Sequence, residues 1–312
     1  MEIKDKKILV TGGAGFLGQY VVKELIRNNV PKKNIFVPRS KDLDIRTERN
    51  CKKAVRGMNI VIHLAGNVGG IGKNQALPGT LFYDNVTMGV HLIHASMLEK
   101  VKKIVILGTI CAYPKYTPVP FSEDNLWIGY PEETNAPYGL AKKILLVQSQ
   151  AYRKEYGLNS IFLLPVNLYG PGDNFDPKSS HVIPALIKKI SDEIRDKKDH
   201  IDVWGDGSST REFLYVEDAA KGIVLAAKKY DKPDPVNLGS GMEISIKELV
   251  YLISKLMNYK GEIIWDTTKP NGQPRRRLDT SRSKKEFGFI AKTPFEKGLR
   301  KTIQWYMNKK YE

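Results

Sequence analysis

The stretch KILVTGGAGFLG at residues 7–18 decides the fold of this chain. Its apolar part, residues 7–11, suits a parallel strand that is buried on both faces. Glycines then recur as GxxGxxG, directly before a helix that the pattern predicts over 15–27. Glycine permits a tight turn and a close backbone approach to a pyrophosphate, and the helix N-terminus offers free N–H groups. The stretch therefore predicts a dinucleotide site made by Gly12, Gly13, Gly15, Phe16, Leu17 and Gly18.

Strand-like and helix-like segments continue to alternate through the first half of the chain. The expected strands are 34–37, 59–64, 103–107 and 160–165, and the expected helix before the third of these is 85–100. Repeated strand–helix–strand units are typical of a mostly parallel sheet with helices on both faces. We therefore predict an α/β protein with a doubly wound sheet of the Rossmann type.

Turn-forming residues gather after the strand at 160–165, in the run YGPGDNFDP at 169–177. Glycine, proline, asparagine and aspartate in such density mark a boundary. We predict a dinucleotide-binding domain over 1–168, to which the chain returns near 210–240. Residues 169–312 are predicted to form mainly a smaller, mixed α/β domain that binds the substrate.

The charge balance points to an anionic partner. The 312 residues include 50 Lys plus Arg against 34 Asp plus Glu, a formal net charge of +16. Such a field attracts anions. The basic residues are spread along the chain, with one tight cluster at 275–277, whereas nucleic-acid binders concentrate them on one face. We expect a phosphorylated small ligand and no nucleic-acid partner.

Cysteine, histidine and apolar content exclude several other classes. Cys51 and Cys111 lack the spacing of a disulfide framework or a zinc site, and His91 and His94 are interpreted as packing residues, so no metal is expected. No apolar run approaches the ~20 residues of a membrane span, and the first apolar stretch is shorter than a signal-peptide core. A cytoplasmic protein without membrane association is the expectation.

The residues after the second predicted strand bear on the cofactor. An acid at this place bonds a free ribose 2′-hydroxyl, whereas a base accepts a 2′-phosphate. The chain offers Arg39, Ser40 and Lys41, which favours NADP over NAD. Two alternatives stay open, because Arg39 and Lys41 are also ordinary loop charges in a lysine-rich protein, and Asp42 and Asp44 lie nearby.

A tyrosine and a lysine stand four residues apart, at Tyr138 and Lys142, on one face of a predicted helix. An ammonium beside a phenol favours the phenolate and lowers its pKa from ~10. The tyrosine then exchanges a proton with a carbonyl oxygen while a hydride moves. Downstream of a dinucleotide loop, this pair indicates an oxidoreductase.

The glycine loop, the Tyr-x-x-x-Lys pair and the turn NLYGP at 167–171 together resemble the extended short-chain dehydrogenase/reductase superfamily of nucleotide-sugar enzymes. Further strings resemble the GDP-L-fucose synthase family within it. These strings are VGGI at 68–71, CAYP at 111–114, NF at 174–175, SHVIP at 180–184, WG at 204–205 and REF at 211–213. The resemblance implies 3,5-epimerisation of GDP-4-keto-6-deoxy-D-mannose and then NADPH-dependent reduction at C4, which gives GDP-L-fucose.

The same resemblance implies roles for individual residues. The family's acid/base cysteine and histidine fall on Cys111 and His181, and its carbonyl-binding serine falls on Thr109. A neighbouring cation stabilises a thiolate, and histidine titrates near neutrality, so this pair suits proton exchange at carbon. Implied cofactor contacts are Lys142, Pro165, Asn167 and His181, in addition to the glycine loop and Arg39. Implied contacts to the GDP-sugar are Lys189, Trp204, Arg211 and Asp279, with the role of 275–277 left open between diphosphate binding and solvent exposure.

Other functions stay open at this point. Ala14 stands where the family often has a positive residue, which weakens the preference for NADP. A nucleotide-sugar 4-epimerase with bound NAD, an enzyme for a related GDP-4-keto sugar, and a non-catalytic sensor of NADP or RNA are the alternatives. Cys111 also fits a small buried hydrophobe. The superfamily resemblance further implies a homodimer formed through the helices at 85–100 and 138–156.

Overall fold

The apolar run at the start of the chain forms strand β1 (Ile8–Thr11), all of whose residues are buried. The computed structural model describes residues 1–269 and 271–310. β1 belongs to a sheet of six parallel strands in the order β10-β5-β4-β3-β1-β2. The other strands are β2 (Ile35–Phe36), β3 (Ile60–His63), β4 (Lys103–Leu107), β5 (Ser160–Pro165) and β10 (Val236–Leu238). A segment late in the chain thus completes the sheet.

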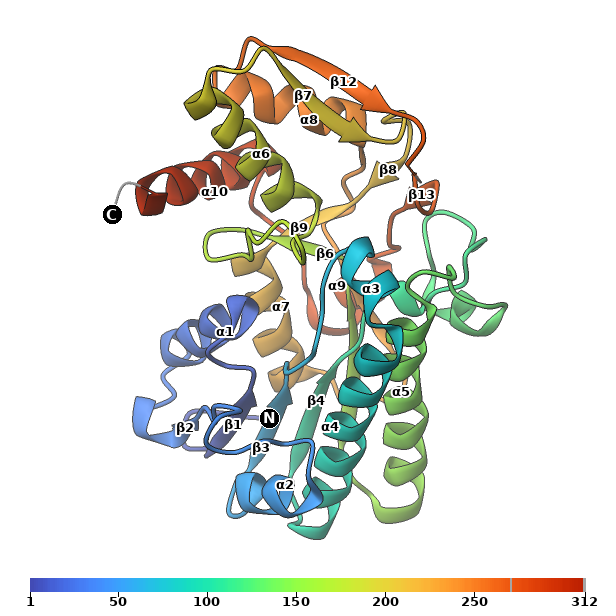
Figure 1. Ribbon diagram of the computed structural model, residues 1–312. Helices are drawn as coiled ribbons and strands as arrows, with labels where there is room; N and C mark the ends of the chain where they lie inside the picture. Colours follow the sequence, from blue (N-terminus) through green and yellow to red (C-terminus); the bar gives the residue numbers. More distant parts are fainter. Residues whose placement is uncertain (270, 311–312) are drawn as a thin grey trace.

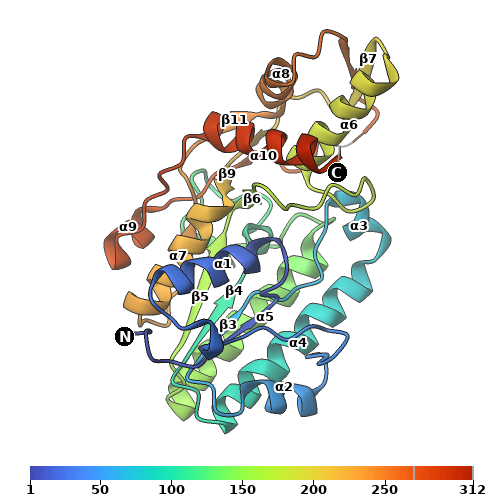
Figure 2. The same cartoon turned by 90° about the vertical axis from the view of Figure 1, so that its left-hand side faces the viewer.

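Helices cover both faces of this sheet (Figures 1 and 2). α1 (Phe16–Arg27) packs against α7 (Val216–Lys229) on one face. The other face carries α2 (Glu48–Val55), α4 (Pro78–Leu98) and α5 (Ala136–Tyr156), of which α4 and α5 pack closely together. The predicted doubly wound α/β fold is therefore confirmed.

Several elements differ in length from their predictions, and α4 differs most. α4 starts at Pro78 rather than near residue 85, because proline lacks the N–H that the first helical turn does not need. β2 shrinks to two residues, directly before Val37 and Pro38. α5 ends where predicted, since Gly157 adopts the left-handed conformation that closes a helix.

A smaller cap of short strands and helices lies above the carboxyl ends of the parallel strands (Figure 1). Its two-stranded sheets pair β7 (His200–Trp204) with β12 (Glu262–Asp266), and β6 (Asn167–Tyr169) with β9 (Phe213–Tyr215). A three-stranded sheet has the order β11-β8-β13, with bounds β8 (Thr210–Arg211), β11 (Ile244–Ser245) and β13 (Arg275–Arg276). The helices of the cap are α6 (Val182–Asp196), α8 (Ile246–Leu256) and α10 (Phe295–Lys310).

Local sequence explains how the cap helix α8 begins. Ser245 accepts the N–H of Glu248, and the Glu248 carboxylate accepts the N–H of Ser245, so a capping box starts α8. The remaining elements are α3 (Ile71–Ala76), α9 (Ser281–Phe287) and 3₁₀ turns at Lys32–Asn34, Ile110–Ala112 and Glu123–Trp127.

Each of the two parts packs around its own hydrophobic cluster. The larger cluster lies between the six-stranded sheet and its helices, with Leu9, Ile106 and Leu163 fully buried. The smaller one joins the cap elements and includes Ile187 of α6 and Ile253 of α8. The carboxyl ends of the parallel strands, where such folds bind ligands, therefore face a separately packed second layer.

Candidate active site

A cavity of about 1410 Å³ lies between the carboxyl ends of the strands and the cap. The loops after β1, β3, β4 and β5 form one wall, and residues of α6, β7, β8 and β13 form the other. A volume above the ordinary range for small ligands suits two large molecules bound side by side.

The glycine loop lies at one end of this cavity. Gly12 has a φ of +70°, and a Cβ on Gly18 would lie 2.0 Å from the Gly12 carbonyl oxygen, so both positions require glycine. Gly15 caps α1 without a side-chain hydrogen bond, which leaves N–H groups of the first turn directed at the cavity. Phe16 and Leu17 also line the cavity. A backbone cradle at a helix N-terminus fits the pyrophosphate of a dinucleotide.

Gly13 has a different role from its neighbours. It does not line the cavity, and a Cβ on it would lie 2.8 Å from Cγ1 of Val37. Gly13 therefore lets the loop pack against the end of β2, which is the segment that leads to Arg39.

Arg39 and Ser40 line the end of the cavity beyond β2. Among the residues that the structure describes, no hydrogen bond or ion pair engages the exposed Arg39 side chain. Lys41 does not line the cavity. Arg39 is thus the predicted cation that is available to an anionic group at this end.

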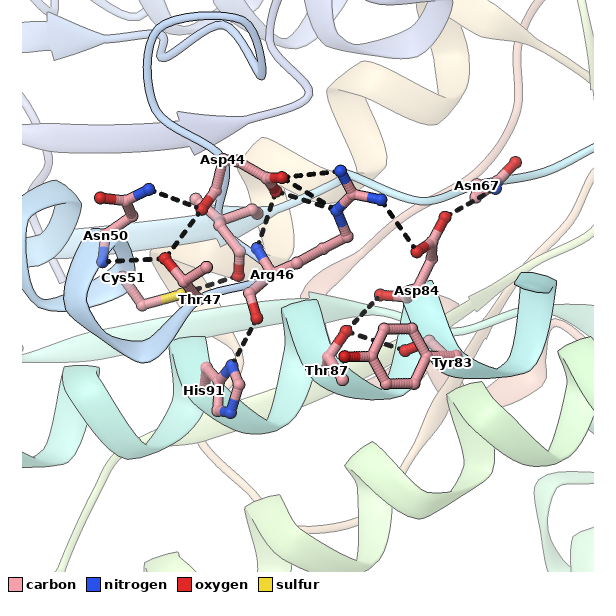
Figure 3. A network of polar contacts seen from close by, with 11 residues as sticks. Asp44, Arg46, Thr47, Asn50, Cys51, Asn67, Tyr83, Asp84, Thr87 and His91 are labelled. Atoms are coloured by element: carbon pink, nitrogen blue, oxygen red, sulfur yellow. Dashed lines mark hydrogen bonds and ion pairs between the residues drawn. The ribbon is translucent and has the colours of Figure 1, made fainter. Parts of the chain in front are cut away.

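Asp44 and Arg46, which follow Arg39 closely in the sequence and also line the cavity, form an ion pair with each other (Figure 3). Two oxygens of Asp44 accept hydrogen bonds from the Arg46 guanidinium, at distances of 2.7 to 3.1 Å, which hold the pKa of Asp44 below its usual range. Nη1 of Arg46 also reaches Asp84 on α4 at 3.2 Å, and Asp84 accepts the amide of Asn67 at 2.9 Å. The charge of Asp44 is therefore compensated, so it opposes an anion at Arg39 less than its sequence position suggested.

Tyr138 and Lys142 stand on one face of α5, as their spacing predicts, and both line the cavity. Lys142 is only 3% exposed, and its Nζ lies 3.5 Å from the Ala65 carbonyl oxygen. Burial lowers the pKa of Lys142 to about 8. A cation held with so few partners favours an anion or a negatively polarised oxygen close by.

The expected lowering of the Tyr138 pKa is not what the structure gives. Burial raises the pKa of the phenol above its usual range, the thiol of Cys111 adds to this, and a hydrogen bond with Thr109 lowers it only partly. The prediction rested on charge alone, whereas removal of the phenolate from water outweighs it here. Tyr138 is therefore a protonated donor in this structure.

Thr109 and Cys111 follow β4 at the middle of the cavity floor. Thr109 caps the 3₁₀ turn, and its Oγ1 accepts the N–H of Cys111 at 3.2 Å. A Cβ on Gly139 would lie 2.2 Å from the Cys111 carbonyl oxygen, so α5 approaches this turn as closely as backbone allows. That contact brings the turn against the segment of α5 that carries Tyr138.

His181 reaches the cavity from the cap side. It caps α6 with no side-chain hydrogen bond to the helix and lines the cavity. Desolvation within the cleft, and secondarily the charge of Arg276, lower the pKa of its imidazole. A neutral imidazole accepts a proton and, once charged, returns it.

Lys189 and Trp204 line the cap wall. Lys189 Nζ donates to the Asp202 carbonyl oxygen at 2.5 Å. The Trp204 ring is 54% exposed, and Nζ of Lys269 lies 5.8 Å from its centroid. An exposed indole at a cavity offers a planar surface on which an aromatic base stacks.

Arg211 is the third predicted contact in the cap. Its Nη1 donates to the carbonyl oxygens of Thr210 and Gln273, at 2.7 and 2.6 Å, and its Nη2 donates to that of Asn271 at 3.2 Å. Burial and the nearby Arg276 both lower the pKa of its guanidinium. Neutral acceptors hold its geometry and leave its charge uncompensated, which favours an anionic ligand.

Asp279, also predicted as a substrate contact, does not line the cavity. Its Oδ1 accepts the N–H of Ser281 at the start of α9, and its backbone bonds Phe121 and Asn237. Pro165 and Asn167, by contrast, line the cavity where β5 ends.

Comparison with known proteins places this chain in a family. The model of the NAD dependent epimerase/dehydratase family matches residues 8–239. The chain belongs to this family. It is 37% identical to a GDP-L-fucose synthase of Sinorhizobium fredii, over 98% of this chain and 97% of that protein. A GDP-L-colitose synthase of Yersinia pseudotuberculosis is 36% identical, over 97% of this chain and 99% of that protein.

Among solved structures, a GDP-L-fucose synthetase from Naegleria fowleri bound to NADP superimposes with a TM-score of 0.87 and 29% identity, covering 99% of this chain and 94% of that one. The resemblance that we inferred from the sequence motifs is thereby confirmed. The individual residue roles stay predictions, because these similarities concern whole chains.

Sequence reasoning left the role of the run 275–277 open and did not single out Arg276 within it. Arg276 lines the cavity next to Cys111, and Gln273 holds it there. The only available signal was the run 275–277, in which a strand period of two sends neighbouring side chains to opposite faces. Arg46 was missed too, because its partner Asp84 lies far along the chain.

The described residues contain neither a metal-binding cluster nor a membrane-spanning helix. Within 1–269 and 271–310, no group of three or more histidine, cysteine, aspartate or glutamate residues is placed to hold a metal ion. No helix in these ranges is long and apolar enough to cross a membrane.

Proposed function

We propose that this protein converts GDP-4-keto-6-deoxy-D-mannose to GDP-L-fucose, by epimerisation at C3 and C5 and then NADPH-dependent reduction at C4. The observation that carries the proposal is the presence of Cys111 and His181 in the same cavity as Tyr138, Lys142 and the glycine loop. A simple carbonyl reductase needs only Tyr138, Lys142 and the glycine loop. Cys111 and His181 add the acid/base pair that epimerisation requires.

The C4 ketone makes the C3 and C5 protons acidic, because loss of either leaves an enolate with its charge on the C4 oxygen. Tyr138 and Thr109, which both line the cavity, would donate hydrogen bonds to that oxygen, and such donors stabilise developing charge. Cys111 as the thiolate removes the proton from carbon, and His181 as the imidazolium returns a proton to the opposite face. His181, whose imidazole pKa is lowered in the free protein, takes up that proton from solvent before the step. Each cycle inverts one centre and leaves the protein in need of a single internal proton transfer.

The residues present fit NADPH as the reductant. The glycine loop and α1 N-terminus would hold its pyrophosphate, Arg39 and Ser40 its 2′-phosphate, and Lys142 its nicotinamide ribose. When bound, the cofactor supplies the hydride that reduces C4. Tyr138 gives its phenolic proton to the C4 oxygen in that step, which the protonated state favoured by burial makes possible.

The GDP moiety fits the cap wall. Arg211 and Lys189 offer positive charge to the diphosphate, and Trp204 offers a stacking surface to guanine. Arg276 lines the cavity between this wall and Cys111 and adds a second guanidinium. We draw no contact from Asp279, because its carboxylate is already engaged at α9.

A GDP-linked 4-keto-3,6-dideoxy sugar is the second candidate substrate. The relative named GDP-L-colitose synthase is about as similar to this chain as the fucose synthases are. Small changes in a pocket discriminate such sugars by only ~1–3 kcal/mol. Assays with both substrates under one set of conditions decide between them.

The test is to incubate the protein with GDP-4-keto-6-deoxy-D-mannose and NADPH in deuterated water. We expect the reduced-nicotinamide absorbance to fall in proportion to the sugar that is consumed. NMR should show GDP-L-fucose as the product, with deuterium at C3 and C5. Reduction without epimerisation would reduce the proposal to a 4-reductase. No reaction with the 4-keto sugar, together with inversion at C4 of a nucleotide sugar that has a C4 hydroxyl and with no net cofactor use, would favour the NAD-dependent 4-epimerase instead.

Cys111→Ser separates these outcomes further. We expect deuterium exchange at carbon to fall about a hundredfold to ten-thousandfold, since a hydroxyl is a poor base at neutral pH. Cys51→Ser is the matched control, because Cys51 is fully buried in α2, donates to the Ile45 carbonyl and lies outside the cavity. Unchanged exchange in Cys111→Ser would remove Cys111 from the mechanism.

We also propose a homodimer in the cytoplasm. Phe82 and Tyr83 of α4 and Ile144 and Val147 of α5 are each at least 37% exposed, and apolar exposure on adjacent helices suits a helix–helix interface. A compartment that keeps thiols reduced suits an enzyme that depends on the free thiol of Cys111. Light scattering should give twice the mass of one chain, and a single-chain mass would contradict the dimer.

A further inference from the structure

We propose that Arg276 is a positioning residue that holds Cys111 as a thiolate in the free enzyme. The proposal rests on the proposed function in one respect, the use of Cys111 as a base. The ionisation of the thiol itself is measurable without any sugar.

The contact between the two side chains is direct. Nη1 of Arg276 donates to Sγ of Cys111 at 3.7 Å, a hydrogen-bonding distance for sulfur. Arg276 is 8% exposed, so water screens this contact weakly. A guanidinium at this distance favours the anionic form of a thiol.

Gln273 fixes the guanidinium in place. Its Oε1 accepts Nε–H of Arg276 at 2.8 Å, and its Nε2 donates to the Lys115 carbonyl oxygen at 2.8 Å. Lys115 lies four residues after Cys111, so one buried glutamine joins the arginine to the segment that carries the cysteine. The charge is thus held at the sulfur rather than free to turn into solvent.

The register of β13 explains why Arg276, and not its neighbour, reaches the thiol. Arg276 pairs with Arg211 of β8, and both side chains line the cavity. Arg275 points the other way, where its guanidinium forms an exposed ion pair with Glu243 at 2.8 Å. Two adjacent arginines in one short strand therefore have opposite surroundings.

The charged and titratable groups around Cys111 leave a net positive surrounding. Arg276 and Arg211 act on it from β13 and β8, and the Tyr138 phenol on α5 is protonated. His181, whose imidazole pKa is lowered, adds no charge at neutral pH. Glu132 is the nearby acid, and neutral donors from Thr134 and Asn135 already bind its carboxylate at 2.6 Å.

The experiment measures alkylation of Cys111 by iodoacetamide as a function of pH in the native chain without substrate. Mass spectrometry follows the Cys111 peptide, and fully buried Cys51 serves as the unreactive internal reference. We expect the midpoint of the rate profile to rise by about one pH unit or more in Arg276→Met, a fall of about tenfold in rate near neutral pH. Arg276→Lys should retain an intermediate profile because it keeps the charge.

Arg275→Met is the matched control, since it removes the same charge from the same strand outside the cavity. We expect its alkylation profile to equal that of the wild type. A profile unchanged in Arg276→Met, or shifted equally in Arg275→Met, would overturn the proposal. Should Arg276→Met not fold, the wild-type midpoint decides: a value at that of an ordinary thiol, ~8.5, would overturn it and a lower value that rises in Arg276→Lys would support it.

The same variants separate this proposal from the proposed function. Slower deuterium exchange at C3 and C5 in Arg276→Met, together with a shifted alkylation profile, supports both. A shifted profile in a protein that epimerises no GDP-sugar supports the thiolate and contradicts the function.

Discussion

The two ends of the parallel sheet each bury a lysine, with opposite consequences. Lys103 begins β4 at the amino end of the sheet, and Lys142 on α5 lies at the carboxyl end, near the residues that follow β3. Both are at most 3% exposed, and burial lowers the pKa of both to about 8. Their degree of burial therefore does not distinguish them.

Their partners do. Lys103 donates to the Tyr230 carbonyl oxygen, and its strand end is closed by backbone hydrogen bonds to Asn59. Lys142 has one long contact, 3.5 Å to the Ala65 carbonyl oxygen, and faces the large cavity. A buried ammonium bonded within the closed end of the sheet faces no cavity, whereas one with a single long contact beside a cavity is ready for a ligand.

Replacement of each lysine by methionine is the strongest way to break this comparison. Lys142→Met should lower the rate of NADPH-dependent reduction by about a hundredfold to ten-thousandfold, because Tyr138 loses its cationic neighbour and the cofactor a donor. Lys103→Met should leave the rate per folded molecule unchanged. Stopped-flow absorbance gives both rates, and similar losses in the two variants would show that the ends of the sheet are not functionally distinct.

A second contrast concerns backbone groups rather than charges. Gly18→Ala should weaken NADPH binding by about 4 kcal/mol, roughly a thousandfold in Kd, because the new Cβ would lie 2.0 Å from the Gly12 oxygen and would push the loop out of its cradle. Gly79→Ala in α4 is the control, since nothing lies within 4 Å of its Cβ position. Fluorescence titration measures both affinities. Near-equal affinities would mean that the loop is not the pyrophosphate site.

The same contrast separates what the sequence could predict from what it could not. The strand, glycine loop and helix at 7–27 were predictable because neighbours in the chain are neighbours in space and backbone atoms carry the function. The spacing of Tyr138 and Lys142 likewise fixes a shared helix face. In both cases a local period determines the geometry.

The cap wall was predicted less well, because it joins segments that are distant in the chain. Arg276 meets Cys111 only through the pairing of β13 with β8, and no spacing in the sequence encodes that contact. Asp279, three residues further on, turns away from the cavity to start α9. The direction of the Tyr138 pKa also depended on burial, which one sequence does not reveal.

The smallest expected effect is on stability, and it sharpens the comparison of the two lysines. The unfolded chain binds a proton at Lys142 up to pH 10.5, but the native chain does so only up to about pH 8. The free energy of unfolding of the wild type should therefore rise with pH across that window, and below it the buried charge destabilises the fold in full.

Lys142→Met removes this cost. We expect its free energy of unfolding to exceed that of the wild type by about 1–3 kcal/mol at neutral pH and not to exceed it above pH 10.5. Lys103→Met should gain less, because it leaves the Tyr230 carbonyl without its donor. Urea unfolding across this pH range tests both, and a Lys142→Met advantage that does not change with pH would show that the charge of Lys142 is not its source.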